Sequence, residues 1–138
     1  MDLQNLGYAL TQVAHNLGAV SVTGGAAAAC LAKTAAAQGL QRQLARVVCA
    51  GWVVQGASGL SFGAISYAGY GQFPDIHGIA IAALMIKMVC AVAGFTAAAL
   101  YLKREARWTA PVRGRVWTLQ LTFALTALTA AAFLRWFS

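Results

Sequence analysis

The chain has 138 residues, of which 60% are hydrophobic and 9% are charged, and its formal net charge is +7. Because an average soluble domain is about 25% charged, this chain has too little polar surface to cover a water-soluble globule, and the same figures exclude disorder. Three cysteines are too few for a disulfide-stapled secreted domain. The composition therefore predicts a small integral membrane protein.

Four apolar stretches are long enough to cross a bilayer as helices, since a span needs about 20 mostly apolar residues. We place these spans at residues 6–31, 42–66, 75–102 and 116–136. Glycine and proline mark the connections between them, and little chain remains for anything else. The sequence thus predicts a single transmembrane domain, residues 1–138, folded as an all-α four-helix bundle.

Basic residues gather on one side of these spans. The other side carries Arg135, and the turn before Pro74 has no basic residue. The positive-inside rule therefore places the basic side in the cytoplasm and both termini outside. We expect a multi-pass membrane protein. Nucleic-acid binding is not expected, because no interleaved basic and aromatic surface remains outside the spans. The residues of the basic side are Lys33, Arg42, Arg46, Lys103, Arg104, Arg107, Arg113 and Arg115.

Small or hydroxylated residues recur at helical spacing in three of the spans. In lipid, helices associate through close packing and interhelical hydrogen bonds, so such stripes indicate packing faces. The stripes are Gly18, Val22, Gly25 and Ala29 in the first span, Gly56, Gly59 and Gly63 in the second, and Thr118, Thr122, Thr126 and Thr129 in the fourth.

Three ionisable side chains inside or at the ends of spans are candidates for a site, because a charge in the bilayer is costly. His15 lies in the first span, His77 in the first turn of the third, and Lys87 near the middle of the third. The alternation of the spans places both histidines on the outer side. Two neutral imidazoles from facing helices are what six-coordinate haem iron requires. We therefore expect His15 and His77 to ligate one iron, with Asp75 or a carbonyl holding the second ring nitrogen of His77.

Ordinary structural roles are the alternative for each of these residues. His15 could bond to a neighbouring helix, and His77 could lie at the interface. Counted at about 1.5 Å per residue, His15 lies about 13 Å and His77 about 3 Å from the start of its span, which argues against a shared iron. Lys87 could snorkel, bond to Gln55 or Ser58, or meet a haem propionate or a quinone oxygen.

Two short segments, residues 52–59 (WVVQGASG) and 76–87 (IHGIAIAALMIK), resemble small four-helix bacterial membrane proteins related to the copper-resistance D family. More loosely, the chain is similar to cytochrome b subunits. The resemblance implies a histidine in the first helix, here His15, and a lysine midway along the third, here Lys87. It implies copper handling or b-type haem, and with only two histidines a second haem is not expected. The resemblance also implies the bacterial inner (plasma) membrane as the location.

The sequence favours a membrane b-type cytochrome over a stand-alone enzyme. One haem b near the outer face would pass electrons between a periplasmic or quinol donor and a partner subunit, with quinone as a further candidate cofactor. One alternative is a non-catalytic accessory subunit of a larger membrane complex or homo-oligomer, docked through the stripes. The other is a copper-handling protein, because the third span carries the soft ligands Met85, Met88 and Cys90.

Overall fold

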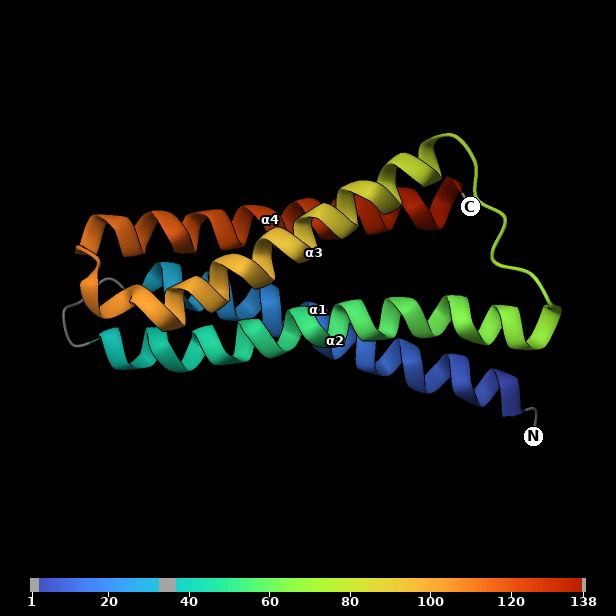
Figure 1. Ribbon diagram of the computed structural model, residues 1–138, viewed down its shortest axis with the longest axis horizontal. Helices are drawn as coiled ribbons and strands as arrows, with labels where there is room; N and C mark the ends of the chain where they lie inside the picture. The colour runs from blue at the N-terminus through green and yellow to red at the C-terminus, as the bar shows by residue number, and fades with distance from the viewer. Residues whose placement is uncertain (1–2, 33–36, 138) are drawn as a thin grey trace.

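The structure is a computed structural model, and it describes residues 3–32 and 37–137. Within these residues the fold is all-helical, as predicted, and contains no strand. Figure 1 shows long helices running side by side, with α1 beginning and α4 ending at the same end of the bundle. The elements are α1 (Leu3–Leu31), α2 (Gln38–Tyr70), α3 (Ile79–Arg104), the short 3-10 turn η2 (Glu105–Arg107) and α4 (Ala110–Phe137).

In the part of the chain that the structure describes, three helical segments are long and apolar enough to cross a membrane, namely α2, α3 together with η2, and α4. With 29 residues, α1 is about as long as these three segments. Over a length that spans a bilayer its mean hydropathy is lower than theirs, because Gln12, His15 and Asn16 interrupt its apolar sequence. Large hydrophobic side chains are exposed on all four helices, as Leu17 on α1 and Leu60 on α2 illustrate. The outer surface of the bundle is therefore apolar.

The connection before α3 has the predicted length but lies four residues later in the chain, because α2 ends at Tyr70 instead of residue 66. Gly71 ends α2 in the left-handed conformation, with φ 70°, and its N–H donates to the carbonyl of Tyr67 at 2.9 Å. Gly78 has φ 49° and ψ −113°, which is not helical, so α3 begins at Ile79 rather than at residue 75. The prediction that His77 lies in the first turn of this helix is therefore wrong, because His77 lies in the connection.

The fourth helix begins earlier than predicted, at Ala110 instead of residue 116. Pro111 stands in its first turn, where the missing N–H removes no helical hydrogen bond. Proline therefore starts this helix rather than interrupting it, and Arg113 and Arg115 belong to α4 and not to a loop.

The four helices form two antiparallel pairs, α1 with α2 and α3 with α4, and each helix contacts its partner in the pair more extensively than it contacts any one helix of the other pair. In Figure 1, α2 and α3 lie close together at the end that carries η2 and diverge towards the end that carries residues 71–78. The hydrophobic core lies mainly in the half of the bundle that carries η2. Its members include Val22, Ala26, Ala29, Val48, Trp52, Ala98, Tyr101, Trp117 and Ala124.

Close packing of α1 on α2 follows one of the predicted stripes. Gly18, Val22, Gly25 and Ala29 are all buried. A Cβ at Gly25 would lie 2.7 Å from Cγ2 of Val48 on α2, so a larger residue does not fit there without movement. The packing role predicted for this stripe is confirmed.

The other two stripes contribute little to helix packing within the chain, although a Cβ at Gly63 would lie 3.7 Å from the Phe73 ring in the connection after α2. A Cβ at Gly56 or Gly59 would meet no atom within 4 Å, and α2 instead buries Gly51 against α1. The threonines of α4 are exposed, and Thr118, for example, donates its hydroxyl to the Gly114 carbonyl at 3.2 Å. The internal packing expected of these two stripes is therefore wrong. The face that α4 buries consists of Trp117, Gln120, Ala124, Ala127 and Ala130.

One buried glutamine joins the two helix pairs at the centre of the bundle. Gln120 on α4 is 1% exposed. Its Oε1 accepts from Nε1 of Trp52 on α2 at 3.1 Å, and its Nε2 donates to the Gly94 carbonyl on α3 at 2.7 Å. The indole of Trp52 also lies directly against Gly94, where a Cβ would clash with the ring. These contacts fix the separation of α2, α3 and α4 at this level.

Candidate functional site

Three helices bring His15, Ser58 and Lys87 together. Nδ1 of His15 on α1 lies 2.7 Å from Oγ of Ser58 on α2, and Nε2 lies 2.9 Å from Nζ of Lys87 on α3. Ser58 is buried, and the two ionisable side chains are half-buried. The sequence predicted both His15 and Lys87 as site residues, but it did not predict that they contact each other.

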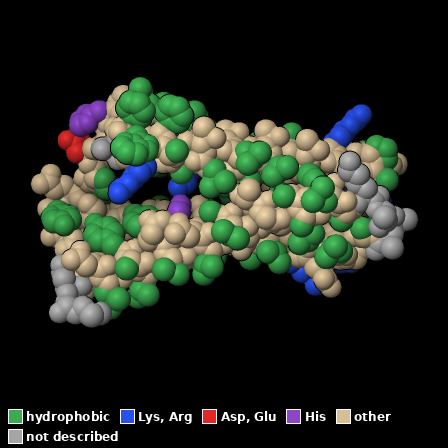
Figure 2. Space-filling view, turned by 180° about the vertical axis from the view of Figure 1, so that it is seen from behind, with side chains coloured by type: hydrophobic (Ala, Val, Ile, Leu, Met, Phe, Trp, Pro, Cys, Tyr) green, Lys and Arg blue, Asp and Glu red, His purple; other side chains and the backbone are tan. Residues whose placement is uncertain are grey.

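This cluster lies where the two helix pairs begin to separate. Ser58 is about 9 Å beyond Trp52 along α2, and Lys87 is about 10 Å before Gly94 along α3, at 1.5 Å per residue. Both steps lead away from the core towards the divergent end. In Figure 2 a purple histidine side chain is visible inside a hollow, next to blue Lys or Arg atoms, which agrees with the contact between His15 and Lys87.

The hydrogen bonds of Ser58 determine the tautomer of His15. The single hydroxyl proton of Ser58 is donated to the Val54 carbonyl at 2.6 Å. Oγ of Ser58 must therefore accept at His15, so Nδ1 of the ring carries a proton and Nε2 carries the lone pair. Nε2 then accepts from Nζ of Lys87. In this arrangement Ser58 accepts a hydrogen bond from His15, so the histidine does not activate the hydroxyl as a nucleophile.

Further contacts hold the His15 ring in place. Nε2 of Gln55 donates to the backbone carbonyl of His15 at 2.5 Å. The ring of Phe62 meets the imidazole edge-on, with centroids 5.8 Å apart. Gln55 and Ser58 were predicted as partners of Lys87, whereas in the structure both bond to His15.

Lys87 has no carboxylate partner among the described residues. Asp75 contacts His77, and Glu105 lies at the other end of the bundle, where it contacts Gln38 and Arg42. An ammonium group has three N–H donors, and the described contacts of Lys87 use one of them, towards His15. The half-buried amine therefore keeps donors available inside the hollow.

His77 is not part of this cluster. Its side chain is 78% exposed, and Nε2 lies 3.0 Å from Oδ1 of Asp75, the partner that the sequence suggested for this ring. His77 makes no hydrogen bond, ion pair or ring contact with His15 or Lys87. The arrangement thus lends no support to a single iron held by both histidines.

The soft ligands of α3 are not gathered either. Met85 and Met88 are more than half exposed, whereas Cys90 is buried in the core. In residues 3–32 and 37–137, no group of three or more His, Cys, Asp or Glu side chains could hold a metal ion.

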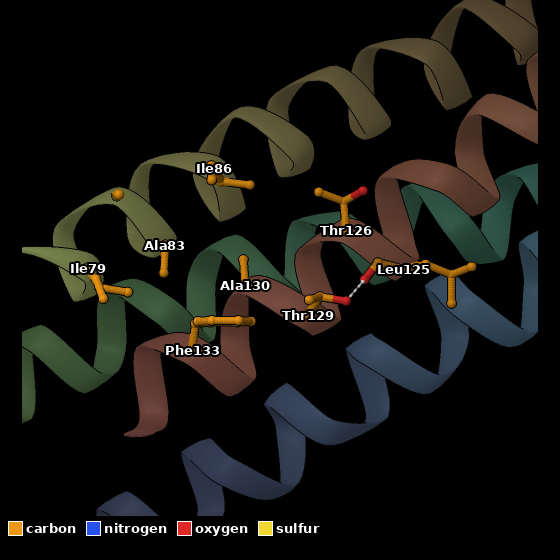
Figure 3. Close-up of a pocket in the computed structure, with 9 residues that line it drawn as sticks. Ile79, Ala83, Ile86, Leu125, Thr126, Thr129, Ala130 and Phe133 are labelled. Atoms are coloured by element: carbon orange, nitrogen blue, oxygen red, sulfur yellow. Dashed lines mark hydrogen bonds between the residues drawn. The ribbon is translucent and has the colours of Figure 1, made fainter. Parts of the chain in front are cut away.

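A groove of about 450 Å³ runs between α3 and α4 on the divergent side of the core. Figure 3 shows Ile79, Ala83 and Ile86 of α3 facing Ala130 and Phe133 of α4. Its lining is apolar apart from two threonine hydroxyls, and that of Thr129 is bonded to its own helix. The groove suits a hydrocarbon group rather than a polar one.

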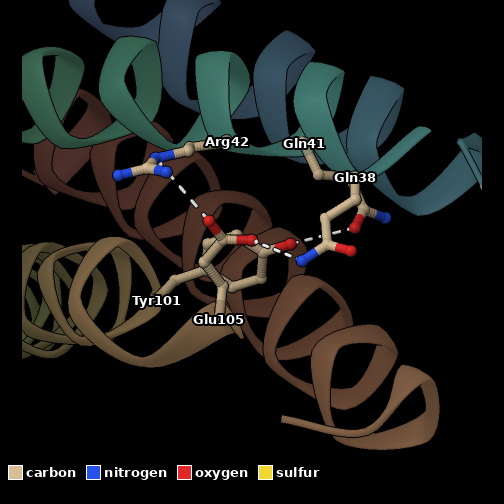
Figure 4. Close-up of polar contacts among 5 residues, drawn as sticks. All are labelled: Gln38, Gln41, Arg42, Tyr101 and Glu105. Atoms are coloured by element: carbon tan, nitrogen blue, oxygen red, sulfur yellow. Dashed lines mark hydrogen bonds and ion pairs between the residues drawn. The ribbon is translucent and has the colours of Figure 1, made fainter. Parts of the chain in front are cut away.

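A second polar cluster closes the opposite end of the bundle (Figure 4). Glu105 in η2 is 4% exposed, accepts from Nε2 of Gln38 at 3.1 Å, and lies 3.6 Å from Nε of Arg42. The hydroxyl of Tyr101 donates to Oε1 of Gln41 at 2.9 Å. The role of Glu105 in joining η2 to the start of α2 was not predicted from the sequence.

The chain matches no family model, no curated protein and no solved structure. The resemblance to the copper-resistance D family therefore stays a prediction, and the function has to be argued from the geometry of the cluster.

Proposed function

We propose that the chain is an integral membrane protein in which all four helices span the bilayer of a bacterial plasma membrane. The apolar surfaces of α2, α3 and α4 support this proposal. The extensive packing of α1 on α2 supports the insertion of α1, whose His15 faces Ser58 and Lys87 while Leu10 and Leu17 are exposed. The clustering of basic residues at the end that carries η2 favours a cytoplasmic location for that end, with both termini outside.

Within this bundle, the proposed function is to bind the polar end of a membrane-soluble ligand at Lys87 and His15. The observation that carries this proposal is the half-buried amine of Lys87, which contacts Nε2 of His15 and no described carboxylate. A cation in the bilayer costs about 2.5–3.5 kcal/mol on insertion scales and marks a functional site by default. A carbonyl or carboxylate oxygen would accept the remaining N–H groups. Quinones and haem propionates both offer such oxygens.

Haem b bound by His15 alone is a second candidate. Its support is the hydrogen bond from Nδ1 to Ser58, because the histidines that ligate metals commonly donate their other ring N–H in this way. Nε2 of His15, which accepts from Lys87 in this structure, would be the ligand atom, so Lys87 would have to leave it and contact a propionate instead. The haem would supply one-electron transfer between a periplasmic or quinol donor and a partner subunit.

The test is the ligand content of the purified protein. Wild type, Lys87→Met and the matched control Lys103→Met would be purified in a mild detergent, and bound small molecules would be extracted for mass spectrometry. Lys103 is exposed at the basic end of α3, so its replacement removes the same charge away from the cluster. Because a hydrogen bond to a charged group contributes about 1.5–3 kcal/mol, we expect Lys87→Met to weaken binding by about ten- to a hundredfold.

Two results would refute the proposal. One is a wild-type protein that carries no lipophilic ligand with a carbonyl or carboxylate group. The other is equal loss of the ligand in Lys87→Met and Lys103→Met. A difference spectrum of the reduced and oxidised protein decides the haem candidate, which predicts a b-type band that His15→Ala abolishes and His77→Ala leaves in place. Wild-type protein that is free of ligand and purifies only with other membrane subunits would instead favour an accessory role.

A further inference from the structure

A polar cavity of about 550 Å³ lies at the basic end of the bundle, away from Lys87. It opens between the end of α1 and the beginnings of α2 and α4. Its polar lining comes from Gln38 and Gln41 of α2 and from Arg113, Trp117 and Thr118 of α4. The proposed function makes no use of this cavity.

The electrostatics of the cavity favour an anion. The N-terminal ends of α2 and α4 both lie at its wall, and the free N–H groups of a helix N-terminus carry positive partial charge. The half-buried guanidinium of Arg113 uses Nη1 to donate to the Trp108 carbonyl at 2.6 Å, and its other N–H groups are additional donors.

The nearby negative groups are already satisfied. Among the described residues no acidic side chain lines the cavity, and Glu105, which bonds to Gln38, lies against Arg42. The last carbonyls of α1 would also repel an anion. The carbonyl of Ala29 in α1 and that of Ala32, just after the helix, accept from Nε2 of Gln41 at 3.2 and 2.9 Å.

Trp117 provides an independent sign of a ligand. Its side chain is 1% exposed and lines the cavity. The ring packs against that of Tyr101, with centroids 4.9 Å apart, but its buried Nε1 makes no hydrogen bond of normal geometry with a described residue. Most buried donors in proteins are paired, and an unpaired one costs about as much as a lost hydrogen bond. An acceptor oxygen in the cavity would satisfy this N–H.

We propose that the cavity binds the phosphate group of an anionic lipid from the leaflet at the basic end. The inference rests on the proposed insertion of the bundle into a bilayer, because the cavity then lies at the level of the lipid headgroups. Basic pockets between membrane helices on the cytoplasmic side recognise such headgroups. Arg113 and the indole N–H of Trp117 are the groups that contact the phosphate.

The experiment is native mass spectrometry of the full chain in micelles, titrated with phosphatidylglycerol, with phosphatidylcholine and with inorganic phosphate. The variants are Arg113→Gln and Trp117→Phe, which keeps an aromatic ring but removes the N–H. Arg107→Gln is the matched control, because Arg107 is exposed and does not line the cavity. Since one basic residue near the membrane surface contributes about 1 kcal/mol, we expect Arg113→Gln to weaken phosphatidylglycerol binding about fivefold. Trp117→Phe also weakens it, and Arg107→Gln leaves it unchanged.

Three outcomes would overturn the proposal. Equal binding of phosphatidylglycerol and phosphatidylcholine by wild type would show that the cavity does not recognise the charge of the headgroup. Equal weakening by Arg113→Gln and Arg107→Gln would indicate diffuse charge attraction. Inorganic phosphate that binds in an Arg113-dependent way and displaces the lipid would assign the cavity to a free anion. A chain that does not enter micelles would refute the membrane proposal itself, and the ligand content at Lys87 is measured separately.

Discussion

Replacing Gln120 with leucine removes the polar side chain that joins α2, α3 and α4. Leucine has a similar volume, so the change leaves no large cavity, and the effect comes from the two hydrogen bonds, to Trp52 at 3.1 Å and to Gly94 at 2.7 Å. Hydrogen bonds between membrane helices average about 0.6 kcal/mol each, and a buried donor left unpaired, here the indole N–H of Trp52, costs about 1–3 kcal/mol. We therefore expect the free energy of unfolding to fall by about 1–3 kcal/mol.

The assay is reversible unfolding in mixed micelles, followed by the loss of helical circular dichroism. A double-mutant cycle with Trp52→Phe isolates the bond between the two side chains, because Trp52→Phe removes the donor that Gln120 accepts. In a wild-type background Trp52→Phe lowers the stability, whereas in the Gln120→Leu background it costs less, by about 0.5–1.5 kcal/mol. Purely additive effects, or a Gln120→Leu variant as stable as wild type, would refute the role assigned to this glutamine.

Other substitutions test the packing and the cluster. Gly94→Ala inserts a methyl group into the rigid ring of Trp52, so we expect a loss of about 1–3 kcal/mol in the same unfolding assay. Gly59→Ala points into open space and should stay within about 1 kcal/mol of wild type; a large loss there would mean that this face is packed. Ser58→Ala removes the acceptor of Nδ1–H of His15, so the ratio of ring tautomers, measured by ¹⁵N NMR, should shift by about fivefold towards Nε2–H. An unchanged spectrum would contradict the tautomer deduced from the Ser58 bonds.

The sequence located the connection between α2 and α3 to within four residues, since the predicted span ended at residue 66 and α2 ends at Tyr70. Gly71 ends α2 because it adopts the left-handed conformation that glycine tolerates. The same kind of rule misled at Pro111, because proline breaks a helix interior but is tolerated in a first turn. Which of these two positions a proline occupies depends on where the helix starts, and α4 starts at Ala110, six residues before the predicted start.

The candidate site was only half predictable. His15 and Lys87 stand out because ionisable residues are rare in apolar spans, so composition alone identifies them. Their contact could not be derived, since residues 72 positions apart meet only when the rotation of each helix about its axis is known. The sequence predicted that His15 and His77 ligate one iron because both lie on the same side of the membrane. That shared side does not place their two rings on facing helix surfaces.

The composition and charge pattern by themselves determined an all-helical chain with an apolar exterior and basic residues at one end, because these properties are sums over many residues. The tertiary structure alone decided which glycines are packed, that Gln120 joins the helix pairs, and that Lys87 meets the lone pair of His15. Each of these outcomes depends on helix rotation and on distances of a few ångströms between side chains remote in the chain. Periodicity does not determine such distances, because one turn of a helix offers several faces of similar polarity.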